Sequence, residues 1–578
     1  MILQALNDYY ERKAQEPESQ IPPYGFGEQK ISFCMVLSKA GKLVKVVDLR
    51  DFDGKQPRPK LLVVPLLSAK RTVKPVSNFL WDNTAYVLGR GDPKKVAKDP
   101  KRFEKTFEEF RSLHREVADT LKDEGLNALL AFLDKWTPDR IDKIKNWDEI
   151  KDTNLVFRLS DDEAYLHDRI ALRRAWADRY ANAAGTTQGM CLVTGHQLPI
   201  AALHPPIKGV GAQTSGASIV SFNLASFTSY KKEQSHNAPI GDAVAFAYTT
   251  ALNHLLRKGS RQRVRLGDTI TVFWAERDTP SENLLAALFD PPEPVAEDSD
   301  TPPKEDPKTT ALVREILQAA KAGQPVTDVD PSLDPDVRFF VLGLSPNNAR
   351  LAVRFWNIST FGQLLDRVGQ HFRDLEIERQ YPSDPEYPPF WRTILETAPH
   401  HKSENVSPLL AGLLARTILS GSRYPRSLFT GILGRIRADH TVNYLRAAIL
   451  KACLVRNHEL EVPMSLDPNR KDTAYRLGRL FALLEKVQKD ATNPTATIRD
   501  RYFGSASATP ATVFPQLLRL GQHHIGKAQY GGRIDKMIAE VLDDIDSLPR
   551  HLSLEDQGLF TVGYYHQRNA LFRKTEKE

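Results

Sequence analysis

The chain has 578 residues, of which 41% are hydrophobic and 26% are charged. This length predicts several domains with an ample core, and the balance is ordinary for a soluble globular protein. No run of about 18 apolar residues is present, so we expect no membrane-spanning helix. The three cysteines lie far apart in the sequence, so they predict neither a disulfide framework nor a clustered metal site, and a reducing cytoplasm fits.

The basic residues are grouped along the chain, and the formal net charge is +7. Such a charge permits an anionic partner without requiring one, because solubility alone tolerates it. By contrast, residues 290–307 are acidic and rich in proline, which predicts an exposed, mobile linker that cannot bury a core. The basic groups are Lys70, Arg71 and Lys74; Arg90, Lys94, Lys95, Lys98, Lys101, Arg102 and Lys105; and Arg257, Lys258, Arg261, Arg263 and Arg265.

The first part of the chain mixes strand and helix patterns. Its start lacks the features of a signal peptide, and apolar residues at helical spacing predict an amphipathic helix there. Alternation over residues 31–49, around the turn Ala40-Gly41-Lys42, predicts a β-hairpin. We predict further strands over residues 60–67, 190–194, 219–222, 269–274, 339–345 and 349–356, and helical patterns over residues 102–145, 161–184, 243–256 and 361–375.

Beyond Pro399 the helical patterns dominate, over residues 408–419, 428–455, 473–487, 510–522 and 532–548. Arg476, Arg479 and Lys486 lie away from the apolar stripe of their segment, and a solvated face is the simplest interpretation of them. We therefore predict an α+β fold. A mixed N-terminal α/β region of mostly antiparallel strands would span residues 1–372, and a C-terminal α-helical bundle would span residues 373–578.

Residues 208–223 combine three glycines, several hydroxyl residues and one central amide, Gln213. Glycine reaches positive φ and lets a backbone approach a ligand closely. Hydroxyl and N–H groups suit phosphate contacts, and an amide can read a base edge. On composition alone, however, a surface loop between two strands is the simpler interpretation.

Catalytic signatures are absent from the sequence. Gly211 and Gly216 have the spacing of a P-loop start, but Ala217-Ser218 follow where the phosphate-binding lysine would stand. No H-E-x-x-H, paired C-x-x-C or G-x-S-x-G motif occurs. The tandem histidines at 400–401 and 523–524 point different ways on a helix and make poor chelates. We therefore expect neither an enzyme nor a cofactor.

Four sequence blocks carry a family resemblance: Asn78-Phe-Leu-x-Asp-Asn, Cys191-Leu-Val-Thr-Gly, Lys208-Gly-Val-Gly-x-Gln-x-Ser-Gly-Ala and Phe340-Val-Leu-Gly-Leu-Ser-Pro-Asn. Together they resemble the large subunit of type I-C CRISPR interference complexes (Cascade). The similarity runs from the first residues into the middle of the chain, and the C-terminal helices fit more loosely. One departure is Lys231, which follows Tyr230 where the family pattern has glycine.

The resemblance implies a non-catalytic subunit of an RNA-guided surveillance complex. Guide pairing supplies sequence specificity there, and the protein reads a short flanking duplex motif, the PAM. The resemblance further implies that the subunit opens the duplex, holds the displaced non-target strand and helps recruit the helicase–nuclease. Its implied partners also include the 5′ handle of the CRISPR guide RNA and the backbone, handle-binding and small subunits.

Given that function, physical chemistry assigns provisional roles, because a PAM reader needs phosphate anchors and a few groups that fit base edges. The candidate phosphate anchors are Lys70, Arg71, Lys74, Lys208, Lys231 and Lys232. The candidate base or wedge contacts are Gln213, Asn223, Asn78, Asn83, Thr214, Ser215 and Ser218.

The resemblance also bears on the C-terminus, because small subunits of this family resemble the large subunit's C-terminal domain and can arise by internal translation. Met464, just before the helical pattern at 473, is a candidate internal start, with an ordinary loop residue as the alternative.

Two other function classes remain open: a DNA-processing nuclease, which would need clustered acidic ligands that the sequence lacks, and a structural scaffold that contacts only protein.

Overall fold

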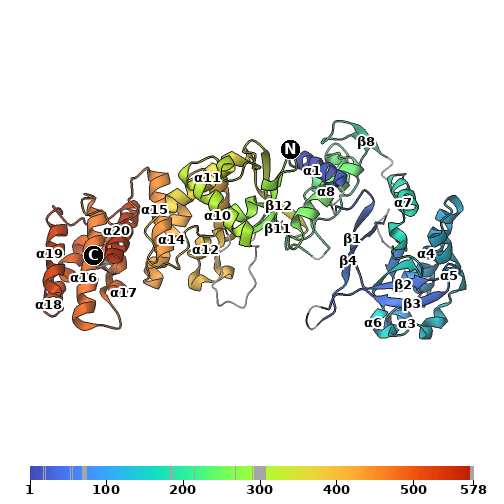
Figure 1. The fold of residues 1–578 in the computed structure, drawn as a ribbon, viewed down its shortest axis with the longest axis horizontal. Helices are drawn as coiled ribbons and strands as arrows, with labels where there is room; N and C mark the ends of the chain where they lie inside the picture. The colour runs from blue at the N-terminus through green and yellow to red at the C-terminus, as the bar shows by residue number, and fades with distance from the viewer. Residues whose placement is uncertain are drawn as a thin grey trace. The chain divides into compact units, whose positions relative to one another are not determined.

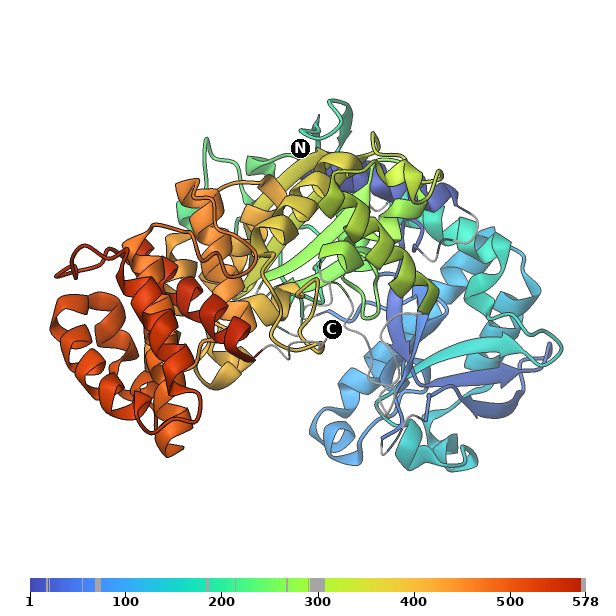
Figure 2. The ribbon, with the colours of Figure 1, turned by 60° about the vertical axis from the view of Figure 1, so that its left-hand side comes forward.

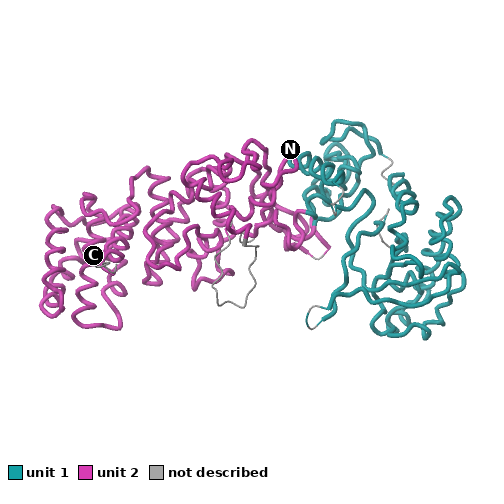
Figure 3. The backbone as a smooth tube through the Cα atoms, viewed as in Figure 1, with its two compact units in different colours: residues 1–207, 218–254 teal, residues 208–217, 255–578 magenta. Residues whose placement is uncertain are grey.

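The computed structural model describes residues 1–572 except 17, 18, 20, 53, 55, 68–73, 183–186, 214, 267, 268, 290 and 292–306. The chain forms two compact units, which Figure 3 distinguishes by colour. Unit 1 comprises residues 1–207 and 218–254, and unit 2 comprises residues 208–217 and 255–578. Antiparallel sheets in the N-terminal part and helices in the C-terminal part confirm the predicted α+β fold (Figure 1).

A four-stranded sheet forms the centre of the larger part of unit 1, in the order β3-β2-β6-β5. β2 is apolar and buried along its whole length because strands flank it on both sides and helices cover it. It pairs antiparallel with β3, as the hairpin pattern predicts, and parallel with β6, which the sequence did not predict. The elements are β2 Phe33–Leu37, β3 Leu43–Asp48, β5 Trp81–Asn83, α2 Thr84–Val87, α3 Pro93–Lys98, α4 Pro100–Thr120, α5 Glu124–Lys135, η1 Pro138–Lys143, α6 Trp147–Ile150 and β6 Asn154–Leu159.

The rest of unit 1 is built from two antiparallel ribbons and three helices. The first helix, α1, contacts α8: the Tyr9 hydroxyl lies 3.1 Å from His254 Nδ1, and Tyr10 meets Phe246 edge-on. This explains the apolar spacing at the start of the chain. These elements are α1 Ile2–Gln15, β1 Phe26–Ile31 paired with β4 Lys60–Pro65, α7 Ile170–Asn182, β7 Gln188–Met190 paired with β8 Gln197–Pro199, and α8 Asp242–Leu256.

Unit 2 begins with a second antiparallel sheet in the order β12-β11-β10-β9. Helices α10 and α11 lie against it (Figure 2), and their apolar side chains share one core with those of β10 and β11. Thr360 and Gln363 form a reciprocal capping box that starts α11. The elements are β9 Arg263–Leu266, β10 Thr269–Ala275, α9 Leu285–Phe289, α10 Pro307–Ala322, β11 Arg338–Asn347, β12 Arg350–Thr360 and α11 Phe361–Leu375.

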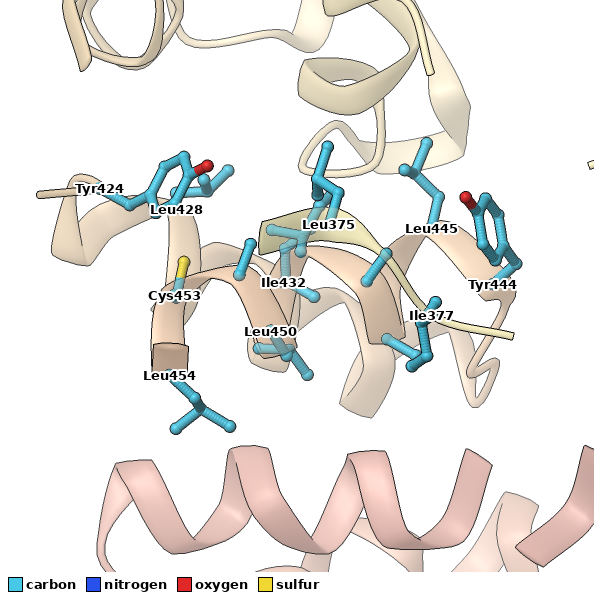
Figure 4. Packing of buried hydrophobic residues seen from close by; sticks show 14 of the residues in the cluster. Leu375, Ile377, Tyr424, Leu428, Ile432, Tyr444, Leu445, Leu450, Cys453 and Leu454 are labelled. Atoms are coloured by element: carbon cyan, nitrogen blue, oxygen red, sulfur yellow. The ribbon is translucent and has the colours of Figure 1, made fainter. Parts of the chain in front are cut away.

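The remainder of unit 2 is helical and continues the same core. α15 is buried along most of its length, and Figure 4 shows its side chains Leu445 and Leu450 near Leu375 of α11. α16 lies at the centre of the last five helices and crosses α20 closely. The helices are α12 Phe390–Leu395, α13 Pro408–Ser420, α14 Arg426–Asp439, α15 Tyr444–His458, α16 Thr473–Thr492, α17 Ile498–Ala508, α18 Pro510–Ile525, α19 Gly531–Leu542 and α20 Leu554–Phe572.

Three predicted elements are wrong. The strand expected over 190–194 is mostly the turn of the β7–β8 hairpin, where Cys191 and His196 pair through their backbones at 2.8 Å. Residues 219–222 are a bend followed by irregular chain rather than a strand. The helix expected over 428–455 is two helices, because His440 takes a left-handed φ of 51° and Asn443 caps the start of α15.

The arginines of α16 are also not solvated. Arg476 is 3% exposed and Arg479 is 8% exposed. Arg476 pairs with Asp544 at 2.7 Å, and Arg479 donates to the carbonyl of Pro468 at 2.9 Å. Both side chains therefore tie neighbouring loops to the central helix.

The predicted division at residue 372 does not coincide with the division into compact units, because residue 372 lies inside α11. A functional division between residues 1–372 and 373–578 stays a prediction. Almost all of the predicted acidic linker at 290–307 lies outside the described residues.

Candidate nucleic-acid interface

The glycine loop, defined as residues 208–217, belongs to unit 2. Gly209, Gly211 and Gly216 have φ angles of 87°, 81° and 93°. Residues other than glycine rarely adopt such φ angles, so the loop favours glycine at all three positions. Residues 211, 213 and 215 at its tip are exposed.

Gln213 closes this loop on itself. Its Nε2 donates to the carbonyl of Gly216 at 3.0 Å, and the Gly216 N–H donates to the carbonyl of Gln213 at 2.9 Å. The Gln213 side chain is nevertheless exposed, as is Ser215 beside it. The amide is thus pre-positioned at the tip and can exchange one internal hydrogen bond for a contact with a ligand.

The base of the glycine loop rests on a cationic strand. Arg263 in β9 donates from Nη2 to the carbonyl of Gly209 at 3.3 Å and from Nη1 to the carbonyl of Leu256 at 2.8 Å. Burial, followed by the charge of Arg265, lowers the pKa of the Arg263 guanidinium. The exposed cations that surround this anchor are Arg257, Lys258, Arg261 and Arg265.

This arrangement joins two features that the sequence presents separately. The basic group at 257–265 lies about 50 residues beyond the glycine loop in the chain, and the Arg263–Gly209 hydrogen bond brings them together. No periodicity in the sequence predicts that contact, because it depends on where β9 joins its sheet. The result is an exposed loop with its cations at one edge of the second sheet.

A second cationic loop occurs in unit 1, at residues 229–232, which we call the lysine turn. Lys232 N–H donates to the carbonyl of Ser229 at 2.9 Å, and Tyr230 and Lys231 have φ angles of 51° and 58°. Two consecutive positive φ angles define a type I′ turn, which favours glycine or asparagine. The side chain of Asn237 stabilises it by bonding to Ser229 N–H at 2.9 Å and to the carbonyl of Lys232 at 2.7 Å.

The lysine turn presents Tyr230 with 94% of its surface exposed, followed by exposed Lys231 and Lys232. Sequence reasoning selected both lysines and missed the tyrosine. The signal was present, because Tyr230 directly precedes the two selected lysines in the sequence. An exposed aromatic ring beside cations can stack on a base.

Two of the candidate asparagines have structural roles. Asn78 is 3% exposed, and its Nδ2 donates to Asp82 Oδ2 at 3.1 Å, so it offers no surface to DNA in this conformation. Asn83 is the N-cap of α2 and accepts from the N–H of Ala85 at 3.0 Å. We therefore leave Asn78 out of the proposed interface.

The other candidates are distributed between the two units. Lys74, Lys208 and Asn223 are exposed, and Ser218 is half-buried. Lys70, Arg71 and Thr214 lie outside the described residues. The described part of the chain contains no group of three or more His, Cys, Asp and Glu residues that could hold a metal ion. No helix among the described residues is both long and apolar enough to cross a membrane.

Comparison with protein families decides the identity of the chain. The model of the family described as CRISPR-associated protein (Cas_Csd1) matches residues 6–572. The chain belongs to the Csd1 family. Members of this family are the large subunits of type I-C CRISPR complexes, so the resemblance given by the four sequence blocks is confirmed. A comparison with curated proteins finds no match.

The Csd1 match extends through the C-terminal helices, to which the sequence blocks gave only loose support. It therefore covers the glycine loop, the lysine turn and the bundle around α16 alike. Membership also establishes a part in CRISPR interference for this chain.

Proposed function

We propose that this Csd1 protein is the non-catalytic subunit that reads the PAM duplex in a type I-C surveillance complex in the cytoplasm. It promotes local unwinding and R-loop formation, holds the displaced strand and helps recruit the helicase–nuclease. Its partners are the guide RNA with its 5′ handle, the target DNA, and the backbone, handle-binding and small subunits. The supporting observation is the exposed glycine loop seated on the cationic strand β9.

In this proposal the two exposed loops have different tasks. The glycine loop offers backbone N–H groups and Ser215 to phosphates, and Gln213 to a base edge beside the first unpaired base. The lysine turn supplies Lys231 and Lys232 as phosphate contacts. Lys74 and Lys208 are further phosphate anchors.

The role of Gln213 is tested by its substitution with alanine and with glutamate in the assembled complex. We expect Gln213→Ala to weaken binding to PAM-bearing DNA by about 1–3 kcal/mol, the usual value of a base-specific contact. Gln213→Glu should weaken it more, because a carboxylate repels the phosphates. Gel shifts on duplexes with and without the PAM provide the measurement, and unchanged affinity and PAM preference for Gln213→Ala would refute the role.

The role of the lysine turn is tested through salt dependence. Replacing Lys231 and Lys232 together by alanine should weaken all duplexes alike and reduce the slope of log K against log salt by about 2 units. The matched control replaces Lys122 and Lys471, which are exposed and make no ion pair with a described residue. An equal reduction of the slope in the control would show that only net charge matters.

We further propose that Met464 starts a separately translated small subunit. Met464 is half exposed in the loop that precedes α16, and the chain from Met464 to Phe572 contains the five helices α16–α20. Intact-mass measurement of a small chain that co-purifies with the complex tests this start. Met464→Leu should remove that chain, whereas a product with another N-terminus excludes Met464.

A further inference from the structure

Unit 1 contains a cleft of about 800 Å³ that the proposed interface does not use. One wall is β3, the edge strand of the first sheet, and the opposite wall is formed by η1 and the residues that follow it. A volume of this size lies in the range of ligand sites rather than of packing defects. The cleft therefore has room for a ligand, and its lining indicates which kind.

The rim of the cleft is strongly cationic. Six of its lining residues are cations, and all six side chains are exposed. Only two are acidic, Asp48 and Glu149, and Arg50 already binds both, at 2.6 Å and 2.5 Å. The cations are Lys42, Lys45, Lys135, Arg140, Lys143 and Lys145.

Within the described part of the chain, the lysines on the two walls are not engaged in ion pairs. Lys42 and Lys45 on one wall, and Lys143 and Lys145 on the other, form no ion pair with any residue that the structure describes. A lysine on an edge strand commonly serves to discourage pairing with another strand, which would explain Lys45 alone. It does not explain a second group of cations on the facing wall, where no strand edge needs protection.

The cleft also has an apolar lining, most of which is buried. Phe33, Phe132 and Trp136 are almost fully buried, and the Trp136 indole is held by a 3.1 Å hydrogen bond to the carbonyl of Leu88. Val44 of β3 is 54% exposed beside the cations. The exposed cations are therefore the groups that a ligand meets, and a nucleic-acid strand matches them with its regularly spaced negative charge.

We propose that this lysine cleft binds the phosphate backbone of single-stranded DNA. A single strand suits the lining because it can place successive phosphates against the exposed cations of both walls. The inference deepens the proposed function, on which it rests, by giving the displaced strand a binding site separate from the glycine loop and the lysine turn.

The first experiment measures binding of a 12-nucleotide oligothymidine to the full-length chain by fluorescence anisotropy over a range of salt concentrations. Lys42→Ala with Lys45→Ala, and Lys143→Ala with Lys145→Ala, should each lower the salt slope by about 1.4, because each lost phosphate contact in a single strand contributes about 0.7. Lysine-to-arginine versions should retain the slope. The control pair Lys122→Ala with Lys471→Ala should also retain it.

Equal slopes for cleft and control variants would overturn the proposal, as would tighter binding of an oligoglutamate peptide or of RNA than of DNA.

The second experiment uses the assembled complex on a PAM-bearing duplex. Cleft variants should keep PAM-dependent gel shifts and expose the displaced strand to a single-strand nuclease several-fold faster than the control. If the cleft variants protect the displaced strand as well as the control does, only the proposal for the cleft is refuted. If the unmodified complex binds DNA without PAM dependence, the proposed function is refuted.

Discussion

Asn83 shows why an amide near a basic loop is weak evidence for base recognition. The sequence places it close to Lys74 and Asn78, in a segment of cations, amides and aromatic residues. In the fold its side chain accepts from the N–H of Ala85 and so caps α2. Capping is a property of the backbone that surrounds the residue, and composition does not report it.

We expect Asn83→Ala to destabilise unit 1 by about 1 kcal/mol through loss of this cap. Asn83→Ser should retain most of the stability, because a serine hydroxyl can accept the same hydrogen bond. Thermal unfolding of both variants measures the difference. If Asn83 instead reads a base, Asn83→Ser would lose PAM-dependent binding while remaining stable.

His114 is a buried residue whose protonation couples pH to stability. Its Nε2 accepts from Leu80 N–H at 2.9 Å and its Nδ1 lies 2.6 Å from the carbonyl of Phe110, so the ring is neutral with the proton on Nδ1. Burial lowers the pKa of His114 to about 4, against the smaller opposing effect of the Phe110 carbonyl. The Leu80 backbone, with a φ of 63°, depends on this acceptor.

The folded pKa lies below the unfolded value, so the unfolded chain takes up the proton first as pH falls. Stability from His114 is therefore complete above about pH 6.5 and is lost progressively toward pH 4, by about 3 kcal/mol in total. His114→Gln, which can accept from Leu80, should give a shallower decline over this window. Urea unfolding between pH 4 and 7 measures it, and parallel curves would contradict the assignment.

At the scale of elements, strong periodicity predicted the helices well, but it did not predict where a helix is interrupted. α11 coincides with the predicted residues 361–375, because a capping box and an apolar stripe both define it. The break at His440 went unnoticed, since apolar residues continue on both sides and only a left-handed φ interrupts the helix. The buried arginines of α16 were assigned to solvent, because their partners are backbone carbonyls of neighbouring loops, which a helical pattern does not reveal.

The crossing of α16 and α20 depends on glycine. A Cβ added at Gly478 would collide with the carbonyl oxygen of Phe560, and one at Gly563 would collide with that of Tyr475. Backbone atoms cannot rotate away as side chains can. The helices therefore approach closely only because both positions lack a side chain.

We expect Gly478→Ala to destabilise unit 2 by at least about 1–3 kcal/mol, the usual cost of overpacking. The matched control is Gly434→Ala in α14, where an added Cβ meets no atom within 4 Å. That control should be neutral or stabilising by up to about 1 kcal/mol, because alanine has the higher helix propensity. Chemical denaturation of both variants decides the matter, and similar stabilities would mean that the helices separate without cost.

At the scale of the whole molecule, the sequence predicted the fold class and the family but not the division into units. The chain leaves unit 1 after residue 207, contributes the glycine loop to unit 2, returns at residue 218 and leaves again after residue 254. A pattern read along the sequence favours one boundary between consecutive domains, and so does not anticipate such a path. The contact between Arg263 and the glycine loop could not be predicted for the same reason, because only the fold brings them together.

The core of unit 2 and the main core of unit 1 have no residue in common, so the two units should unfold as separate transitions rather than in one step. Each core supplies its own cooperative unit, and a change within one core lowers only the corresponding transition. Hydrogen exchange during denaturation can assign each transition to its residues. Gly478→Ala should then shift the transition of residues 255–572 and leave that of residues 21–182 in place, whereas Asn83→Ala should do the reverse. A single transition shifted equally by both variants would show that the units unfold as one.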